Sequence, residues 1–188
     1  PNIARNLDAL AGCELSWCCD ADEAARARYS AVYPDARFTA EFGDMLADDD
    51  LDAVVITTPV PTHAELAARA LEAGKHVFVE KPLAQDATSA ERLVELADER
   101  GRVLMVGHLL CYHPGVRQLA DLIANGDLGE VYYLYSQRLN LGKLRADENA
   151  LWSLGAHDVS VVLSLVGEEP SEVNAFGDLL PGRVVNGR

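Results

Sequence analysis

Apolar runs and helix-like segments alternate along roughly the first 108 residues, and this alternation constrains the fold more than any other feature. Residues 51–57 (LDAVVIT) form a continuous apolar run of the kind that parallel sheets bury on both faces. Residues 76–79 (HVFV) and 102–106 (RVLMV) repeat the pattern, with a helical stretch before each. Strands and helices in this order predict an α/β domain, a parallel sheet with helices on both faces.

The boundaries of the helices follow from capping residues and glycine stops. Thr62 with Glu65, and Thr88 with Glu91, have the spacing of a capping box. A strand over residues 14–19 follows the first helix, and because that helix requires a strand before it, we expect one upstream of Pro1. The expected helices cover about residues 2–10, 22–29, 41–47, 62–73 and 88–100, with Gly12, Gly74 and Gly101 as stops.

The pattern changes in the second half of the chain. Pro114 opens a predicted helix that ends near Gly126, and a β-branched and aromatic run at residues 131–138 predicts a strand. A helix over 151–166 and a strand over 172–176 follow. We therefore expect two domains, a dinucleotide-binding domain over residues 1–110 and the start of an α+β domain over residues 111–188.

Composition excludes several classes of protein. The 188 residues carry a net charge of −14, which disfavours nucleic acid and anionic membranes as partners. No apolar run approaches the roughly 20 residues of a transmembrane helix, and we expect a cytoplasmic protein. The four cysteines lack the spacing of a metal site, so we expect free thiols and no metal.

Chemically useful side chains follow several of the predicted strands, at the edge where open α/β sheets bind ligands. Asp20 ends the strand over residues 14–19 and can bind the ribose hydroxyls of a dinucleotide, although it can equally cap the next helix. Because Ala21 follows it, no adjacent arginine is offered to a 2′-phosphate, which favours NAD over NADP. Thr58, Pro59 and His63 follow the next central strand and are candidate cofactor-binding residues, although a turn and a first helical turn would look alike.

Two residues are candidates for proton transfer. Lys81 follows Glu80 after the strand at 76–79, where it can meet a cofactor and a substrate together, although such a pair is also a common surface salt bridge. His157 can take a proton near neutral pH, and Ser153 and Ser160 share its helical face. A capped or solvated histidine is the simpler alternative.

Taken together, these motifs resemble the Gfo/Idh/MocA (glucose–fructose oxidoreductase / inositol dehydrogenase) family. The matching stretches are Thr58-Pro59 with His63, Gly74-Lys75-His76-Val77, Glu80-Lys81-Pro82, Gly107-His108 and Gly155-Ala156-His157-Asp158. The resemblance implies a Rossmann domain followed by a substrate domain with a mostly antiparallel sheet, and NAD(P) as cofactor. It also implies that Lys81 lies near the nicotinamide and the substrate hydroxyl, that Glu80 lies near the nicotinamide ribose, and that the Lys81–Pro82 bond is cis.

Within that family, three stretches are similar to the nucleotide-sugar 3-dehydrogenase branch: residues 112–114, 138–142 and 149–152. The likeness implies substrate-binding roles for Arg138, Asn140, Asn149, Trp152 and His157. The family commonly has an aspartate four residues before the histidine, where this chain has Ser153. A serine cannot supply charge to an imidazolium, so Lys81 takes more of the proton transfer or this branch dispenses with the aspartate.

The sequence therefore predicts an NAD-dependent oxidoreductase that transfers a hydride between nicotinamide and a sugar, polyol or nucleotide-sugar carbon. Two alternatives stay open, an NAD-dependent glycoside hydrolase of the same fold and a non-catalytic NAD-binding sensor. We expect a small-molecule sugar substrate and a homo-oligomer, either a dimer or a tetramer.

Overall fold

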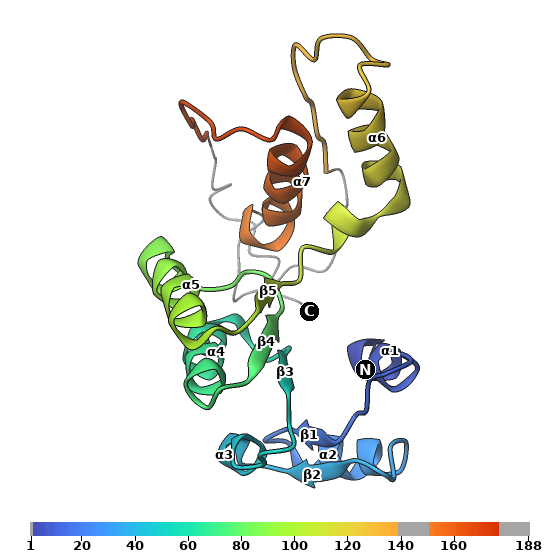
Figure 1. Cartoon of the computed structure of the whole chain (residues 1–188), viewed down its shortest axis with the longest axis vertical. Coiled ribbons are helices and arrows are strands. Elements are labelled where there is room, and N and C mark those ends of the chain that lie inside the picture. Colours follow the sequence, from blue (N-terminus) through green and yellow to red (C-terminus); the bar gives the residue numbers. More distant parts are fainter. Residues whose placement is uncertain (1, 139–150, 177–188) are drawn as a thin grey trace, which may run out of the picture. The chain divides into compact units, whose positions relative to one another are not determined.

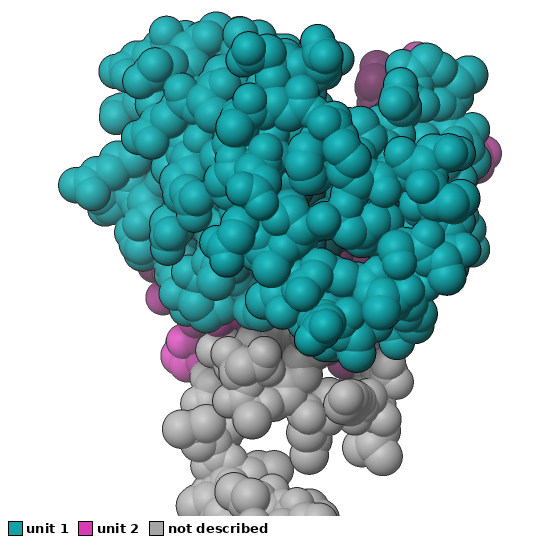
Figure 2. Space-filling view, turned by 90° about the horizontal axis from the view of Figure 1, so that it is seen from below, with its two compact units in different colours: residues 1–108 teal, residues 109–188 magenta. Residues whose placement is uncertain are grey.

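The computed structural model of the chain describes residues 2–138 and 151–176. The chain forms two compact units, residues 1–108 and residues 109–188 (Figure 2, teal and magenta). Within the described ranges, no helix has both the length and the apolar character needed to cross a membrane.

The core of the first unit is a parallel three-stranded sheet in the order β3-β4-β5 (Figure 1). Its strands are β3 (Ala53–Ile56), β4 (His76–Val79) and β5 (Leu104–Val106). Their ends align, with Ile56 opposite Val79 and Val79 opposite Val106. The register places the residues that follow the three strands along one edge of the sheet.

One face of this sheet packs against α4 (His63–Glu72) and α5 (Ala87–Arg100). Alternate strand residues point into this core, because successive side chains on a strand face opposite sides. The most buried members of the core are Val54, Ile56, Val77 and Val79 from the strands and Ala67, Ala70, Leu71, Leu93 and Ala97 from the helices. On the other face Val55 and Phe78 are half-buried and Met105 is 37% exposed, so burial is less even than the apolar runs predicted.

A second parallel sheet pairs β1 (Trp17–Cys19) with β2 (Arg37–Thr39). Helices α1 (Asn2–Asp8), α2 (Glu23–Ser30) and α3 (Phe42–Leu46) belong to the same part of the chain. In the order of a doubly wound sheet, one strand stands between a pair such as β2-β1 and a triplet such as β3-β4-β5. The strand that the sequence predicts upstream of Pro1 stays a prediction.

The predicted helix stops are confirmed, but both capping boxes are wrong. Gly74 and Gly101 have positive φ values of 74° and 61°. A 3₁₀ turn, η1 (Val60–Thr62), precedes α4, and the Thr62 hydroxyl bonds within that turn instead of capping the helix. Helix α5 begins at Ala87, because the carboxylate of Asp86 accepts a hydrogen bond of 2.8 Å from the backbone N–H of Ser89.

The regular elements described in the second unit are helical. A 3₁₀ turn, η2 (Leu109–Tyr112), leads into α6 (Pro114–Ala124), and a π-helical turn, η3 (Leu151–Gly155), leads into α7 (Ala156–Val166). The strands predicted over residues 131–138 and 172–176 are wrong in this structure, since neither segment is assigned to a strand. A strand needs a hydrogen-bonded neighbour, and no described segment pairs with either of them.

Candidate active site

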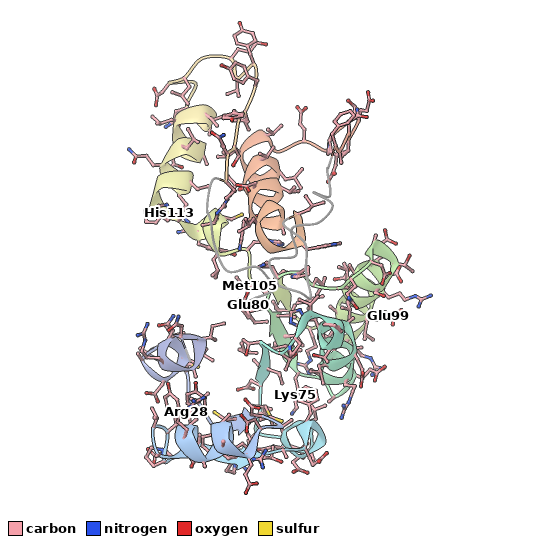
Figure 3. All side chains as sticks on the ribbon, turned by 180° about the vertical axis from the view of Figure 1, so that it is seen from behind. Arg28, Lys75, Glu80, Glu99, Met105 and His113 are labelled. Atoms are coloured by element: carbon pink, nitrogen blue, oxygen red, sulfur yellow. The ribbon has the colours of Figure 1, made fainter. Side chains whose placement is uncertain are left out.

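Polar residues from two neighbouring loops meet at the carboxyl edge of the three-stranded sheet. Thr58 and Pro59 follow β3 and are exposed, whereas Glu80 and Lys81 follow β4 and are half-buried. The main chain extends the ladder into this edge, because the N–H of Glu80 donates to the carbonyl of Ile56 at 2.9 Å. Figure 3 shows Glu80 at this end of β4 and Lys75 at the opposite end. The strand thus delivers a carboxylate and an amine to the edge predicted for ligand binding.

The absence of a side chain at Gly107 leaves space for the carboxylate of Glu80. Gly107 follows β5, is buried, and donates its N–H to the carbonyl of Val79 at 2.8 Å. A Cβ atom at this position would lie 3.2 Å from Oε2 of Glu80 and 3.2 Å from Cζ of Phe78. Gly107 belongs to one of the sequence motifs, which predicted no role for it. The signal that could have revealed it is a glycine directly after an apolar strand at this edge.

His63 lies behind the edge instead of on its surface. The sequence predicted that His63 binds the cofactor, but this residue is only 1% exposed. Its Nε2 lies 2.8 Å from the carbonyl oxygen of Thr58 and its Nδ1 lies 2.8 Å from the carbonyl oxygen of Pro82. The Lys81–Pro82 peptide bond is cis, as predicted. His63 therefore joins the loop after β3 to the loop after β4.

Asp20 follows β1 and exposes its carboxylate. One carboxylate oxygen accepts a hydrogen bond of 2.9 Å from the N–H of Asp22, and Asp22 itself caps α2 by accepting from the N–H of Ala24 at 2.9 Å. Asp20 is thus not the helix cap. The guanidinium of Arg26 donates to the carbonyl oxygens of Asp20 at 2.6 Å and Ala21 at 3.0 Å. The sequence argument missed this arginine because it lies six residues further on, within α2.

His108 ends the first unit at the same edge and had no predicted role beyond the motif. Its Nδ1 is buried and has no hydrogen-bond partner among the residues that the structure describes. Burial lowers the pKa of His108, because an imidazolium loses hydration there. Burial thus favours the neutral form of the imidazole next to Gly107.

The second unit holds the remaining predicted residues. His157 lies partly buried in the first turn of α7, and the Ser160 hydroxyl donates to its backbone carbonyl at 2.8 Å. The carboxylate of Asp158 accepts hydrogen bonds from Ser136 at 2.7 Å and from Nε of Arg138, at 3.1 Å to each oxygen. The structure thus pairs Arg138 with the residue that follows His157.

The other predicted substrate-binding residues divide between described and undescribed parts of the chain. Trp152 lies in η3 and is 43% exposed. Asn140 and Asn149 lie outside the described residues.

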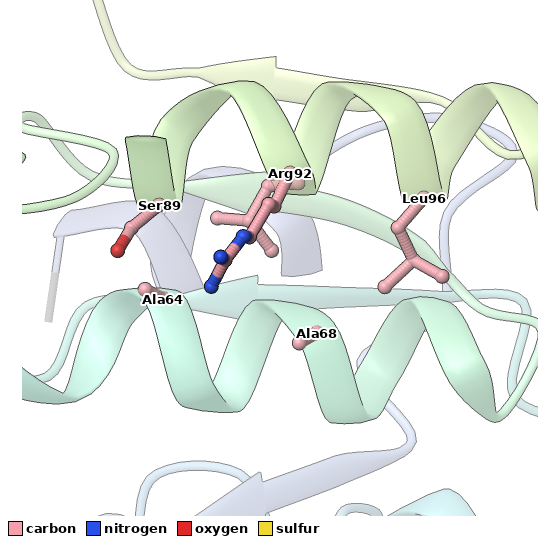
Figure 4. Close-up of a pocket in the computed structure, with 6 residues that line it drawn as sticks. Ala64, Ala68, Ser89, Arg92 and Leu96 are labelled. Carbon is pink, nitrogen blue, oxygen red and sulfur yellow. The ribbon is translucent and has the colours of Figure 1, made fainter. Parts of the chain in front are cut away.

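A groove between α4 and α5 is a separate feature (Figure 4). Its volume is about 190 Å³, and its lining residues are Ala64, Ala68, Ser89, Arg92, Leu93 and Leu96. Ligand pockets usually enclose about 300–1,000 Å³. None of the predicted cofactor-binding or catalytic residues lines this groove, so we do not assign it as the site.

Comparison with known proteins settles the family. Residues 3–108 match the Gfo/Idh/MocA family, described as an oxidoreductase family with an NAD-binding Rossmann fold. The chain belongs to the Gfo/Idh/MocA family.

The relatives and solved structures that the chain resembles have different names. The chain is 37% identical over 129 residues to UDP-N-acetylglucosamine 3-dehydrogenase of Acidithiobacillus ferrooxidans, covering 68% of this chain and 40% of the relative. A structure of a 3-ketoreductase from Actinomadura kijaniata, in complex with NADP and TDP-benzene, is 36% identical with a TM-score of 0.60, covering 65% of this chain and 38% of that one. A structure of a putative myo-inositol dehydrogenase from Sinorhizobium meliloti 1021 is 28% identical with a TM-score of 0.78, covering 89% and 52%.

The chain spans about half the length, or less, of the curated relatives that it matches. The match covers the Rossmann part of a Gfo/Idh/MocA protein, which is where the edge described above lies. The residues that follow β1, β3 and β4 have side chains that fit a nicotinamide dinucleotide. Asp20 exposes a carboxylate after β1, as ribose hydroxyls require, and Thr58, Pro59, Glu80 and Lys81 converge after β3 and β4.

Proposed function

We propose that the full-length protein is an NAD-dependent dehydrogenase. It transfers a hydride between nicotinamide and a hydroxyl-bearing carbon of a sugar or nucleotide sugar. The single observation that carries this proposal is the convergence of Thr58, Glu80 and Lys81 on one sheet edge, where two neighbouring loops are joined through His63. Family membership supports it, since the matched part is an NAD-binding Rossmann fold.

Lys81 is the proposed proton-transfer residue of the first unit. A bound nicotinamide supplies the site that accepts or donates the hydride. Removing a hydride from an alcohol leaves the hydroxyl proton to be taken up, and an amine at the sheet edge can do this when it lies within hydrogen-bond reach. Glu80 stands beside it, with Oε2 accepting from the backbone N–H of Lys81 at 3.3 Å. This contact turns the carboxylate of Glu80 toward the backbone that carries the lysine.

His157 is the proposed second proton-transfer residue, from the second unit. An imidazole can take up or release a hydroxyl proton near neutral pH. Its neighbour Asp158 is held by Arg138 and Ser136, which fixes the first turn of α7. We propose that Arg138, Trp152 and the two asparagines, Asn140 and Asn149, contribute to substrate binding.

NAD is the proposed cofactor in preference to NADP. The Asp20 carboxylate can accept hydrogen bonds from ribose hydroxyls and repels a 2′-phosphate. Arg26 works in the opposite direction, but its guanidinium already donates to two carbonyl oxygens. The 3-ketoreductase relative was solved with NADP, so this preference has to be measured.

Nucleotide sugars are the proposed substrates, because two of the relatives named above act on a UDP-linked sugar or were solved with a TDP compound. We further propose a cytoplasmic homo-oligomer.

The decisive experiment compares the full-length protein with its Lys81→Ala and Arg100→Ala variants. NADH formation is followed with a panel of UDP-sugars, UDP-sugar acids and free polyols. We expect turnover with one substrate class, a loss of at least 100-fold in Lys81→Ala, and no change in Arg100→Ala. The Arg100→Ala substitution removes one positive charge, as Lys81→Ala does, but from an exposed position in the last turn of α5. Equal turnover by all three proteins, or no NADH with any substrate, would refute the proposal.

A further inference from the structure

His63 is the one buried histidine whose two ring nitrogens both contact main-chain carbonyls in the described residues. Nε2 lies 2.8 Å from the Thr58 oxygen and Nδ1 lies 2.8 Å from the Pro82 oxygen. Both distances fall within the normal range for N–H···O hydrogen bonds. His63 is 1% exposed, so its ring is shielded from water.

The two carbonyls belong to loops that carry the proposed cofactor and proton-transfer residues. Thr58 lies five residues before His63 and Pro82 nineteen residues after it, so only the folded chain brings both to one ring. Carbonyl oxygens only accept hydrogen bonds, so a ring nitrogen donates to one of them only when it carries a proton, and a neutral ring donates to one of the two at a time. Loss of the ring would remove both contacts, one in each loop, and a buried acceptor is costly to leave unsatisfied.

We propose that His63 is a positioning residue of this dehydrogenase, and that it sets the place of Lys81 through the carbonyl of Pro82. The inference rests on the proposed role of Lys81. The Thr62 hydroxyl, at 2.7 Å from Oγ1 of Thr58 and 2.8 Å from the Pro59 carbonyl, stiffens the first loop from its other side. His63 extends that stiffness to the second loop. A displacement of about 1 Å at a reacting group can cost roughly 100-fold in rate.

The neighbouring histidine of β4 provides a matched control. His76 opens the strand at the opposite edge of the sheet, where its Nδ1 accepts a hydrogen bond of 2.9 Å from the N–H of Val103. His76→Gln therefore disturbs one side-chain to main-chain hydrogen bond without touching either loop at the carboxyl edge. His63→Gln makes the same chemical change at the bridge.

The first test measures hydrogen–deuterium exchange in the cofactor-free, full-length protein. In His63→Gln we expect exchange at least fivefold faster in two separate segments, residues 57–62 and residues 83–86, with the protection of β4 retained. His76→Gln leaves both segments at the wild-type rate. Faster exchange in α4 alone, or an equal increase everywhere, would overturn the proposal.

The second test separates a positioning role from a stabilising one. His63→Gln is expected to lower kcat of the folded protein at least tenfold, with a smaller change in the KM for substrate. In a Lys81→Ala background the same substitution is expected to change kcat less than twofold, because both act through one group. Equal effects of His63→Gln in both backgrounds would refute the link to Lys81.

The outcomes also distinguish this proposal from the proposed function. If Lys81→Ala keeps its turnover, the proposed role of Lys81 fails whatever His63→Gln does. If Lys81→Ala is inactive while His63→Gln keeps its kcat, the dehydrogenase stands and only the positioning role is lost.

Discussion

Replacement of Gly107 by alanine probes the packing at the carboxyl edge of the three-stranded sheet. The new Cβ atom would lie 3.2 Å from both Oε2 of Glu80 and Cζ of Phe78. Favourable contacts between carbon atoms are found at about 3.5–4.0 Å, so both neighbours would have to withdraw by roughly 0.3 Å or more. Phe78 belongs to the central strand β4, and its side chain is half-buried.

The expected cost follows from this crowding. Overpacking a core position destabilises a protein by about 1–3 kcal/mol. Gly107 is not among the glycines with positive φ, so alanine adds no backbone strain there. Because the added group is one methyl and Glu80 is only half-buried, we expect the free energy of unfolding to fall by about 1–2 kcal/mol. We also expect a several-fold higher KM for NAD, since the Glu80 carboxylate is displaced.

Gly43→Ala is the matched control. Gly43 lies in α3, and the nearest atom to a Cβ there is Nη2 of Arg69 at 3.9 Å, an ordinary contact. Alanine is favoured over glycine inside a helix by about 0.5–1 kcal/mol, so this variant should be as stable as the wild type or slightly more stable. Urea unfolding of the full-length proteins provides both free energies. If Gly107→Ala unfolds at the wild-type midpoint, or if both variants lose the same free energy of unfolding, the argument from crowding is wrong.

Two further predictions concern the first unit. Asp20→Ala should raise the ratio of kcat/KM for NADP to kcat/KM for NAD at least tenfold. The reason is that the carboxylate that repels a 2′-phosphate is gone while Arg26 remains. An unchanged ratio in steady-state assays would contradict this. Trp17→Phe should raise the pKa of Asp48, since the indole N–H, donating at 2.7 Å, is the main cause holding that pKa below its usual value, followed by the N–H of Asp50. A carboxyl group whose pKa is lowered in the folded state stabilises the protein above about pH 4, and this stability is lost as the pH falls through the folded pKa. Because the folded pKa of Asp48 is higher in the variant, the variant loses this stability at a higher pH than the wild type does. Carbon NMR titration of the Asp48 carboxyl measures the shift, and identical titration curves would count against the hydrogen bond.

Local sequence patterns predicted the elements of the fold that depend on local physics. The strands around Val54, Val77 and Leu104 were recognised from their apolar runs, and the stops at Gly74 and Gly101 from the left-handed conformation that glycine tolerates. The capping boxes failed because the path of the chain decides which hydroxyl or carboxylate reaches a free N–H. That path is a tertiary property.

The same limit applies to the site. The sequence placed Thr58, Glu80 and Lys81 at one edge, because parallel strands end together. It could not show that His63 turns inward to Pro82, nineteen residues away, or that Arg26 reaches back to the Asp20 carbonyl. The strand expected at residues 131–138 failed for a related reason. A β-branched and aromatic run indicates a strand only when a partner strand is present.

The position of β4 in the middle of its sheet has a consequence for motion. The strand has a parallel neighbour on each side, and Val77 and Val79 are 2% and 0% exposed. Amide protons in so enclosed a strand exchange only when the domain opens as a whole, whereas loops rearrange within nanoseconds to microseconds. Glu80 and Lys81 are therefore attached to a strand that opens slowly. A ligand bound at this edge would enter and leave through motions of the surrounding loops while β4 keeps its place.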